Sequence, residues 1–214
     1  MEATFCFVDI AGFTALTETH GAQTAADLVD RFGELVAQAL GTDGRVVDRA
    51  GDAIFVVTPT PGDALGFLGR LFAAAAREPH FPVLRAGLHH GEAVERHGTY
   101  FGVAVNLAAR VAAEARGGQT VATKGVADSA ASRSVPVTRL GAVTLKNVRQ
   151  PVELFALDLA PGASPVAVDP VCRMRVDPET APARLRVEGE NRYFCSLECA
   201  RTFLASPHEY GGGT

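Results

Sequence analysis

The chain has 214 residues, a formal net charge of −4 and 47% hydrophobic residues, as expected for a globular protein with one ordinary domain and a small addition. It has no stripe rich in lysine or arginine, so nucleic acid is not expected as a partner. No apolar stretch is long enough to cross a membrane, and no signal peptide is recognisable. We therefore expect a cytoplasmic protein without a membrane anchor.

The first expected element is a buried strand over Phe5–Val8, which is rich in aromatic and branched residues. Asp9 follows at the end of this strand, where a carboxylate can meet a ligand. Gly12 lets the backbone approach that ligand closely, and Thr14 is expected to cap the next helix. The spacing of apolar residues predicts an amphipathic helix over Ala22–Leu40.

Two strands joined tightly at Gly51-Asp52 are expected next, and they would form a hairpin. A second helix starts near Pro61 and stops at Pro79. The elements expected beyond the first helix are strands at Arg45–Ala50, Ala53–Val57 and Leu84–His90, a strand at Glu92–Arg96 paired with the last of these, a helix at Gly102–Arg116, and strands near Gln119–Ala122, Val135–Leu140, Val143–Lys146 and Glu153–Asp158. This order predicts an α+β sandwich with a mostly antiparallel sheet and helices on one face.

A short segment rich in proline, glycine and serine, APGASP, separates two regions of different composition. Three of the four cysteines lie beyond it, within fewer than fifty residues. We therefore expect one domain over residues 1–159, a linker over 160–167 and a small cysteine-rich domain over 168–214.

Two carboxylates are placed as a candidate metal pair. Asp9 and Asp52 each lie at the edge of a predicted strand, and paired carboxylates hold divalent cations for phosphoryl chemistry. Asn106 and Arg110 are four residues apart and share one helix face, where they could hold a ribose and a developing phosphate charge. Lys146, in the late segment TLKNV, could reach a terminal phosphate. Taken singly, each has a plainer interpretation as a turn former or a solvated side chain.

Five segments carry a family resemblance when they are taken together. They are FVDIAGFTAL, AGDAIFVV, LRAGLHHGEAV, GTYFGVAVNLAARV and LKNVRQPVELFAL, and they cover roughly residues 3–158 in the family's order. This stretch resembles a class III nucleotidyl cyclase catalytic domain. The resemblance implies a ferredoxin-like, palm-type sandwich that converts ATP, with GTP as the alternative, to a 3′,5′-cyclic nucleotide and pyrophosphate in intracellular signalling.

The resemblance also implies residue roles. Asp9 and Asp52 would bind two Mg²⁺ or Mn²⁺ ions, Asn106 would orient the ribose, and Arg110 would stabilise charge on the α-phosphate. Lys146 would hold the distal phosphates. Phe13 and Thr14 would contact the nucleotide beside the metal pair. The family places its active sites between two catalytic domains, which implies a head-to-tail homodimer with two sites.

One position departs from the adenylyl cyclase pattern. Asp48 stands where those enzymes have the lysine that reads adenine, while Thr99 at the partner position fits the family. A carboxylate cannot donate to adenine N1 but accepts well from the two donors of guanine. Three readings follow: ATP is used with weak base selection, GTP is the substrate, or turnover is lost and a nucleotide- and metal-binding regulatory dimer remains.

The C-terminal cysteines follow the pattern C-x22-C-x3-C. Cys195 and Cys199 are four residues apart, so on a helix opened by Ser196 their sulfurs point the same way, and Cys172 would join them from a turn. Three converging thiolates suit Zn²⁺ or Cu⁺, and a bound metal would help so small a segment to fold. Buried structural thiols and a redox-labile disulfide are the alternatives.

The same cysteines also carry a second resemblance. Residues 168–210, with DPVC before the trio and a Phe and a Pro after it, resemble a YHS (TRASH-like) domain. This implies a zinc-ribbon-like fold that binds or senses metal. Arg173 stands where the family usually has glycine. Asp169, His208, water and no group at all remain candidates for a fourth ligand.

Overall fold

The computed structural model describes residues 1–42, 44–159 and 167–210. Within them the helices are α1 (Phe13–Leu40), α2 (Pro61–Arg77), α3 (Val103–Ala113), α4 (Lys124–Ser132), α5 (Leu197–Ala205) and α6 (Pro207–Tyr210). The strands are β1 (Glu2–Ile10), β2 (Arg45–Ala50), β3 (Ala53–Thr58), β4 (Leu84–Glu92), β5 (Val94–Arg96), β6 (Thr99–Phe101), β7 (Thr120–Thr123), β8 (Val137–Val143), β9 (Val152–Leu157), β10 (Ala167–Val168), β11 (Arg175–Val176), β12 (Ala183–Val187) and β13 (Glu190–Phe194).

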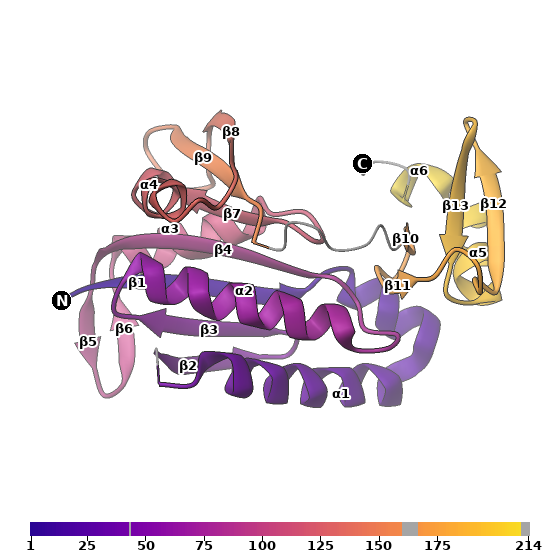
Figure 1. Cartoon of the computed structure of the whole chain (residues 1–214), viewed down its shortest axis with the longest axis horizontal. Helices are drawn as coiled ribbons and strands as arrows, with labels where there is room; N and C mark the ends of the chain where they lie inside the picture. The colour runs from indigo at the N-terminus through magenta and orange to yellow at the C-terminus, as the bar shows by residue number, and fades with distance from the viewer. Residues whose placement is uncertain (43, 160–166, 211–214) are drawn as a thin grey trace.

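A seven-stranded sheet forms the centre of the larger domain, in the order β2-β3-β1-β4-β7-β9-β8 (Figure 1). Strand β1 lies between β3 and β4 and is antiparallel to both. The only parallel pairing in this sheet joins β4 to β7. The predicted α+β class with a mostly antiparallel sheet is therefore confirmed, and the central position of β1 puts its C-terminal end among neighbouring strands.

Helices cover both faces of the sheet, so the expectation of helices on one face was wrong. Alternation along β1 explains the arrangement, since successive side chains point to opposite faces. Cys6 and Val8 pack into a core with α1, α2 and α4. Ala3 and Phe5 pack on the other side with Ala104 of α3. The first strand is thus buried on both faces, which is why its sequence reads as a continuous apolar run.

Helix α3 lies very close to the backbone of β4. A Cβ atom on Gly87 would lie 2.1 Å from the backbone nitrogen of Ala112, a distance that no side chain tolerates. Glycine at this point of the β4 sequence therefore lets the helix lie directly on the strand. This contact fixes the helix that carries Asn106 and Arg110.

Several local predictions were wrong. Helix α1 begins at Phe13 rather than Ala22, with a break at Gly21, where φ is 84°. The segment ending in Arg96 does not pair with β4; Val94–Arg96 pairs with Thr99–Phe101 as a separate hairpin. Strand β8 ends at Val143, so the separate strand expected at Val143–Lys146 does not form, and a turn begins at Lys146. Helix α4 was missed.

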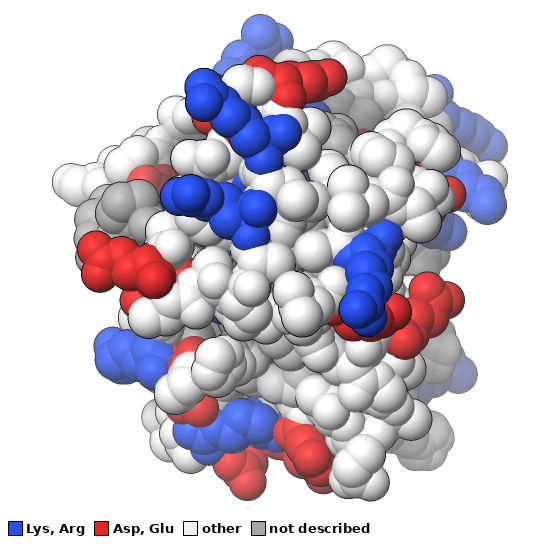
Figure 2. Space-filling view, turned by 90° about the vertical axis from the view of Figure 1, so that its right-hand side faces the viewer, with Lys and Arg blue, Asp and Glu red and all other residues white. Residues whose placement is uncertain are grey.

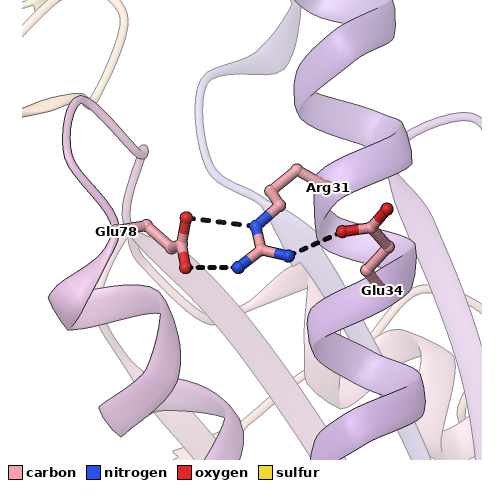
Figure 3. Close-up of polar contacts among 3 residues, drawn as sticks. All are labelled: Arg31, Glu34 and Glu78. Atoms are coloured by element: carbon pink, nitrogen blue, oxygen red, sulfur yellow. Dashed lines mark hydrogen bonds and ion pairs between the residues drawn. The ribbon is translucent and has the colours of Figure 1, made fainter.

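An ion-pair fork joins the two long helices (Figure 3). Arg31 of α1 donates from Nε and Nη2 to the carboxylate of Glu78, at 3.1 and 2.6 Å. Its Nη1 donates to Glu34 one turn further along α1, at 2.6 Å. The hydrogen bonds from Arg31 lower the pKa of Glu78. Both side chains are only partly buried, so the pair adds little stability by itself, and its main contribution is to orient α1 against the end of α2.

The C-terminal region is a small cysteine-rich unit of two hairpins, β10-β11 and β12-β13, followed by α5 and α6. Its core is shared with α1, because Leu16 and Ala25 pack with Cys172, Phe194 and Phe203 in one cluster. Figure 2 views the molecule from the side of this unit and shows basic and acidic side chains interspersed over the surface.

The linker predicted at residues 160–167 lies outside the described residues except for Ala167, the first residue of β10. Among the described helices, none combines the length and hydrophobicity that a bilayer crossing requires.

Candidate active site and metal centre

The ends of β1 and β3 bring the two candidate metal carboxylates onto adjacent strands. Asp9 is in register with Ala53, and the amide of Ile10 donates to the backbone oxygen of Asp52 at 3.3 Å. Asp52 therefore lies in the tight turn that the sequence predicted between β2 and β3. Carboxylate oxygens at this point are the ligands that Mg²⁺ and Mn²⁺ prefer.

Arg85, which sequence reasoning did not single out, pairs with Asp9. Its Nε and Nη2 donate to the two carboxylate oxygens of Asp9 at 2.6 and 2.9 Å. The hydrogen bonds that Arg85 donates to Asp9 raise the pKa of Arg85. A carboxylate has about four lone-pair positions, so the two bonds from Arg85 leave acceptor capacity on Asp9. The pair is therefore compatible with a divalent ion bound on the other side of the carboxylate.

The environment of the Asp52 carboxylate disfavours its ionised form. Burial raises its pKa, and the negative charge of Asp9 raises it further, against a lowering contribution from Arg85. A raised pKa means that the folded protein disfavours the ionised form that a metal ion would need. A cation bound between Asp9 and Asp52 would relieve this cost. The residues present therefore fit the two divalent cations that the sequence implied.

Replacing Asp52 by asparagine is expected to raise the melting temperature while removing a candidate metal ligand. Because the pKa of Asp52 is higher in the folded state than in the unfolded state, its ionised form weakens folding above that raised pKa. The gain should be present at neutral pH and disappear below the ordinary value near 3.8, where the carboxyl is protonated in both states.

Thermal unfolding monitored by circular dichroism in chelator-containing buffer measures this effect. The matched control is Asp48→Asn, because Asp48 is exposed on β2. A lower melting temperature for Asp52→Asn than for the native chain at pH 7 would contradict the stated electrostatic environment.

The loop after β1 differs from its prediction. Gly12 itself is the N-cap of α1, with φ 70° and no side-chain cap, and Thr14 lies inside the helix, so the expected cap by Thr14 was wrong. A cavity of about 350 Å³ opens here. Its lining residues are Ile10, Gly12, Phe13, Thr14, Ala15, Asp52 and Arg85, together with Pro170, Val171, Arg173 and Tyr210 from the C-terminal unit.

A second cavity, of about 750 Å³, contains the other half of the predicted site. Asn106 and Arg110 line it from α3, and Lys146 lines it from the turn after β8. All three side chains are exposed, and neither cation has an ion-pair partner among the described residues. The three side chains are thus grouped around one cavity, and their joint action stays a prediction. The two cavities have no lining residue in common.

The two predicted base-reading residues lie on neighbouring elements. Asp48 is exposed on β2, where its carboxylate accepts from the amide of Arg49 at 2.8 Å, and Thr99 opens β6. Arg45 joins these elements, because its Nη2 donates to the backbone oxygen of Gly98 at 2.9 Å. The start of β2 therefore contacts the turn of the β5-β6 hairpin.

The three C-terminal cysteines converge as the sequence predicted. The sulfurs of Cys172 and Cys195 are 3.3 Å apart, and those of Cys195 and Cys199 are 3.7 Å apart. Ser196 caps α5 by accepting from the amide of Cys199. Hydrogen bonds from the thiols of Cys172 and Cys195 lower the pKa of Cys199.

Asp169, one candidate for a fourth ligand, has another role. Its buried carboxylate accepts from the amides of Val171, Cys172 and Cys195, at 2.8, 3.3 and 2.8 Å. These bonds hold the turn that presents Cys172. The further ligand atom beside the sulfurs comes instead from His20 of α1, whose Nε2 is 3.4 Å from Cys195 and 3.5 Å from Cys199. No local pattern around His20 could have indicated this.

Comparisons with known proteins agree with the geometry. Residues 1–158 match the family model described as the adenylate and guanylate cyclase catalytic domain, and residues 167–214 match the YHS domain. A relative described as the pH-sensitive adenylate cyclase MT1302 of Mycobacterium tuberculosis is 31% identical over 158 residues, which is 72% of this chain and 40% of the relative. The uncharacterized protein Rv2212 of the same species is 35% identical over 178 residues, which is 76% of this chain and 44% of that protein.

Solved structures give the same fold. A Trypanosoma brucei adenylate cyclase, solved in its monomeric state, aligns with a TM-score of 0.69 at 21% identity, over 82% of this chain and 95% of that one. An adenylate/guanylate cyclase/hydrolase from Silicibacter pomeroyi aligns with a TM-score of 0.62 at 26% identity, over 73% and 96%. This chain spans less than half the length of the two curated relatives. On the family match over residues 1–158, the chain belongs to the adenylate and guanylate cyclase catalytic domain family, and a YHS domain follows that domain.

Proposed function

We propose that this protein is a metal-dependent nucleotidyl cyclase that acts as a homodimer and carries a metal-binding YHS tail. The observation that carries the proposal is the division of the predicted residues between two cavities. One cavity is lined by Asp52 and the loop beside Asp9, and the other by Asn106, Arg110 and Lys146. Each half lacks what the other supplies.

A second copy of the chain would complete both halves. Val94, Phe101 and Val103 are 57%, 55% and 82% exposed, although they are large and apolar. They lie on β5, β6 and the start of α3, and Val103 lines the same cavity as Asn106. Exposed apolar residues around a polar cavity are typical of an interface. A head-to-tail dimer would cover them and place Arg110 of one copy opposite Asp52 of the other.

In this proposal Asp9 and Asp52 hold two Mg²⁺ or Mn²⁺ ions, and Arg85 keeps the Asp9 carboxylate oriented. The ions would activate the ribose 3′-hydroxyl of the nucleotide and neutralise its triphosphate. Asn106 would orient the ribose, Arg110 would stabilise the charge that develops on the α-phosphate, and Lys146 would hold the distal phosphates. The products would be a 3′,5′-cyclic nucleotide and pyrophosphate.

ATP is the first candidate substrate, and the relative described as an adenylate cyclase supports it. Asp48 and Thr99 would read the base from β2 and β6. Asp48 also favours a second candidate function, a dimer that binds nucleotide and metal without turnover, because a carboxylate gives adenine N1 no donor.

The test incubates purified protein with Mn²⁺ and either ATP or GTP and detects cyclic product by mass. We expect product that is absent from an Asp9→Asn, Asp52→Asn double variant run beside it. If a confirmed dimer forms no product from either nucleotide but binds one of them, the regulatory function replaces the enzymatic one.

The tail part of the proposal is tested separately. Purified protein under reducing conditions should bind close to one Zn²⁺ or Cu⁺ per chain, and a Cys195→Ser variant should lose it. If no ion is bound after reconstitution, the cysteines are structural thiols.

A further inference from the structure

Four side chains, from two domains, surround one point. His20 comes from α1 of the cyclase domain, and Cys172, Cys195 and Cys199 come from the YHS domain. Their ligand atoms all lie within 4.8 Å of one another. The four residues are half-buried or buried, so an ion among them would be largely shielded from water. This set differs from the three-cysteine site of the tail because one ligand is contributed by the catalytic domain.

The spacing fits a tetrahedral ion. With Zn–S near 2.3 Å and Zn–N near 2.05 Å, tetrahedral ligands are about 3.8 Å apart between two sulfurs and about 3.6 Å between sulfur and nitrogen. Two of the sulfur–sulfur distances are 3.3 and 3.7 Å, two of the sulfur–nitrogen distances are 3.4 and 3.5 Å, and the other two pairs lie within 4.8 Å. Three thiolates and one imidazole form one of the common structural zinc sets.

The local structure explains why His20 reaches the cysteines. The break in α1 at Gly21 separates a first segment, Phe13–His20, from the longer remainder of the helix. Leu16 of this segment is fully buried in the core that the helix shares with the YHS domain.

The same tail touches the candidate active site. The amide of Val83 donates to the backbone oxygen of Arg173 at 3.0 Å, which joins the Cys172 turn to the segment before β4. A Cβ atom on Gly12 would lie 2.7 Å from Cγ of Arg173, so the arginine lies directly on the loop after β1. Arg173 also lines the cavity that contains Asp52.

The backbone conformation at Arg173 is unusual for a residue other than glycine, which supports a role for its contact with Gly12. Its φ of 60° is in the left-handed region, where glycine is favoured and other residues are strained. Glycine is the residue that the YHS resemblance leads us to expect here. The arginine side chain lies over Gly12 and lines the cavity of Asp52, so the strained position places a cation beside that cavity.

We propose that one thiophilic divalent ion, with Zn²⁺ as the best fit, is bound jointly by His20, Cys172, Cys195 and Cys199. The ion fastens the YHS domain to α1 and so holds the Pro170–Arg173 turn over the cavity of Asp52. This inference rests on the proposed metal-binding function of the tail and is independent of cyclase turnover. The tail is then a metal-dependent cover on the nucleotide site.

The test measures Zn²⁺ affinity of the full chain under reducing conditions, by competition with a chromophoric chelator. His20→Ala is expected to weaken binding at least about 100-fold, since loss of even an outer-shell partner costs 10- to 100-fold. His20→Cys should restore tight binding by forming a four-cysteine set. His208→Ala is the matched control, because this exposed histidine lies on α6 of the same tail, and it should bind like the native chain.

Co²⁺ in place of Zn²⁺ reports the ligand set directly. The native chain should show the intense visible bands of a tetrahedral thiolate site, and His20→Ala should change their position and intensity. If His20→Ala binds with native affinity and an unchanged spectrum, three cysteines bind the ion alone and the joint site is wrong. If the native chain binds no ion, the proposed metal-binding function of the tail is wrong as well.

Hydrogen exchange tests the cover. Zn²⁺ should slow amide exchange in Phe13–His20 and in the loop at Gly12, and α2 should be unaffected as an internal reference. The same addition to His20→Ala should leave exchange in α1 unchanged. Equal slowing of α1 in the native chain and His20→Ala would show that the ion does not fasten the two domains through this histidine.

Discussion

Two inactive variants, Asp9→Asn and Arg110→Ala, are expected to restore about a quarter of the native cyclase activity when they are mixed in equal amounts. Each variant alone should lose at least about 10²–10³-fold in kcat, because each removes a group that acts on transition-state charge. Asp9 lies at the end of β1, whereas Arg110 lines a separate cavity on α3. In a head-to-tail dimer the two lesions can therefore fall in the same site.

The expected fraction follows from counting sites. Random exchange of subunits makes half of the dimers mixed, and each mixed dimer has one site with both lesions and one site with neither. The control mixes Arg110→Ala with Asn106→Ala, which lie on the same helix face. Those two lesions damage both sites of a mixed dimer, so no activity should return.

The measurement is cyclic nucleotide production after mixing, with subunit exchange verified by differently tagged chains. Arg110 is exposed, so its replacement should leave the fold intact. If exchange is verified and the mixture stays inactive, the two cavities do not complete one another across a dimer. If either variant alone keeps native activity, that residue has no role in the proposed site.

Much of the fold could be predicted from local patterns. The hairpin of β2 and β3 was found because its apolar strands flank Gly51-Asp52, and α2 was found because a proline opens it. The structure adds the reciprocal capping box between Thr60 and Asp63 at that helix start. These signals depend only on residues close in sequence, which is why periodicity and turn chemistry detect them.

Strand pairing, helices with small buried residues and the placement of helices on the sheet were less predictable. Strand β5 looked like the partner of β4, but whether a short strand pairs with its neighbour or with the next hairpin arm depends on sheet geometry. Helix α4 was missed because its buried face consists of small residues, Val126, Ala127 and Ala130, which give little periodic signal. The two faces of the sheet could be assigned only after α3 was placed.

The residues of the candidate site also divide into those that the sequence identifies and those that only the fold brings together. Asp9, Asp52, Asn106 and Arg110 were identified because ordered segments of the sequence resemble the cyclase family. The contacts of Arg85 and His20 were not, because Arg85 pairs with a residue 76 positions away and His20 lies 175 positions from Cys195. Each is an ordinary helix or strand residue until the fold brings its partner close. The contact of His20 with the cysteines, which joins the two domains, therefore appears only in the folded structure.

Replacing Asp48 by lysine is expected to shift nucleotide preference toward ATP by at least about 100-fold in the ratio of kcat/KM values, because a site that hydrogen-bonds one base edge strongly rejects a mismatched one. Lysine offers a donor to adenine N1, whereas the native carboxylate accepts from guanine N1–H and N2. Asp48 is exposed on β2, so no core contact is lost in the change, and Thr99 begins β6 of the neighbouring hairpin.

The matched control is Asp30→Lys, an exposed position on α1 with the same change of two charges. It should leave the ATP-to-GTP ratio unchanged, which separates base recognition from a general effect of net charge on triphosphate binding. Both ratios are measured by competition, with ATP and GTP present together and the two cyclic products quantified by mass. An Asp48→Lys ratio equal to the control's would mean that Asp48 does not face the base. The exposed carboxylate of Asp48 would then have no part in the choice between ATP and GTP. Base selection would have to come from Thr99 on β6.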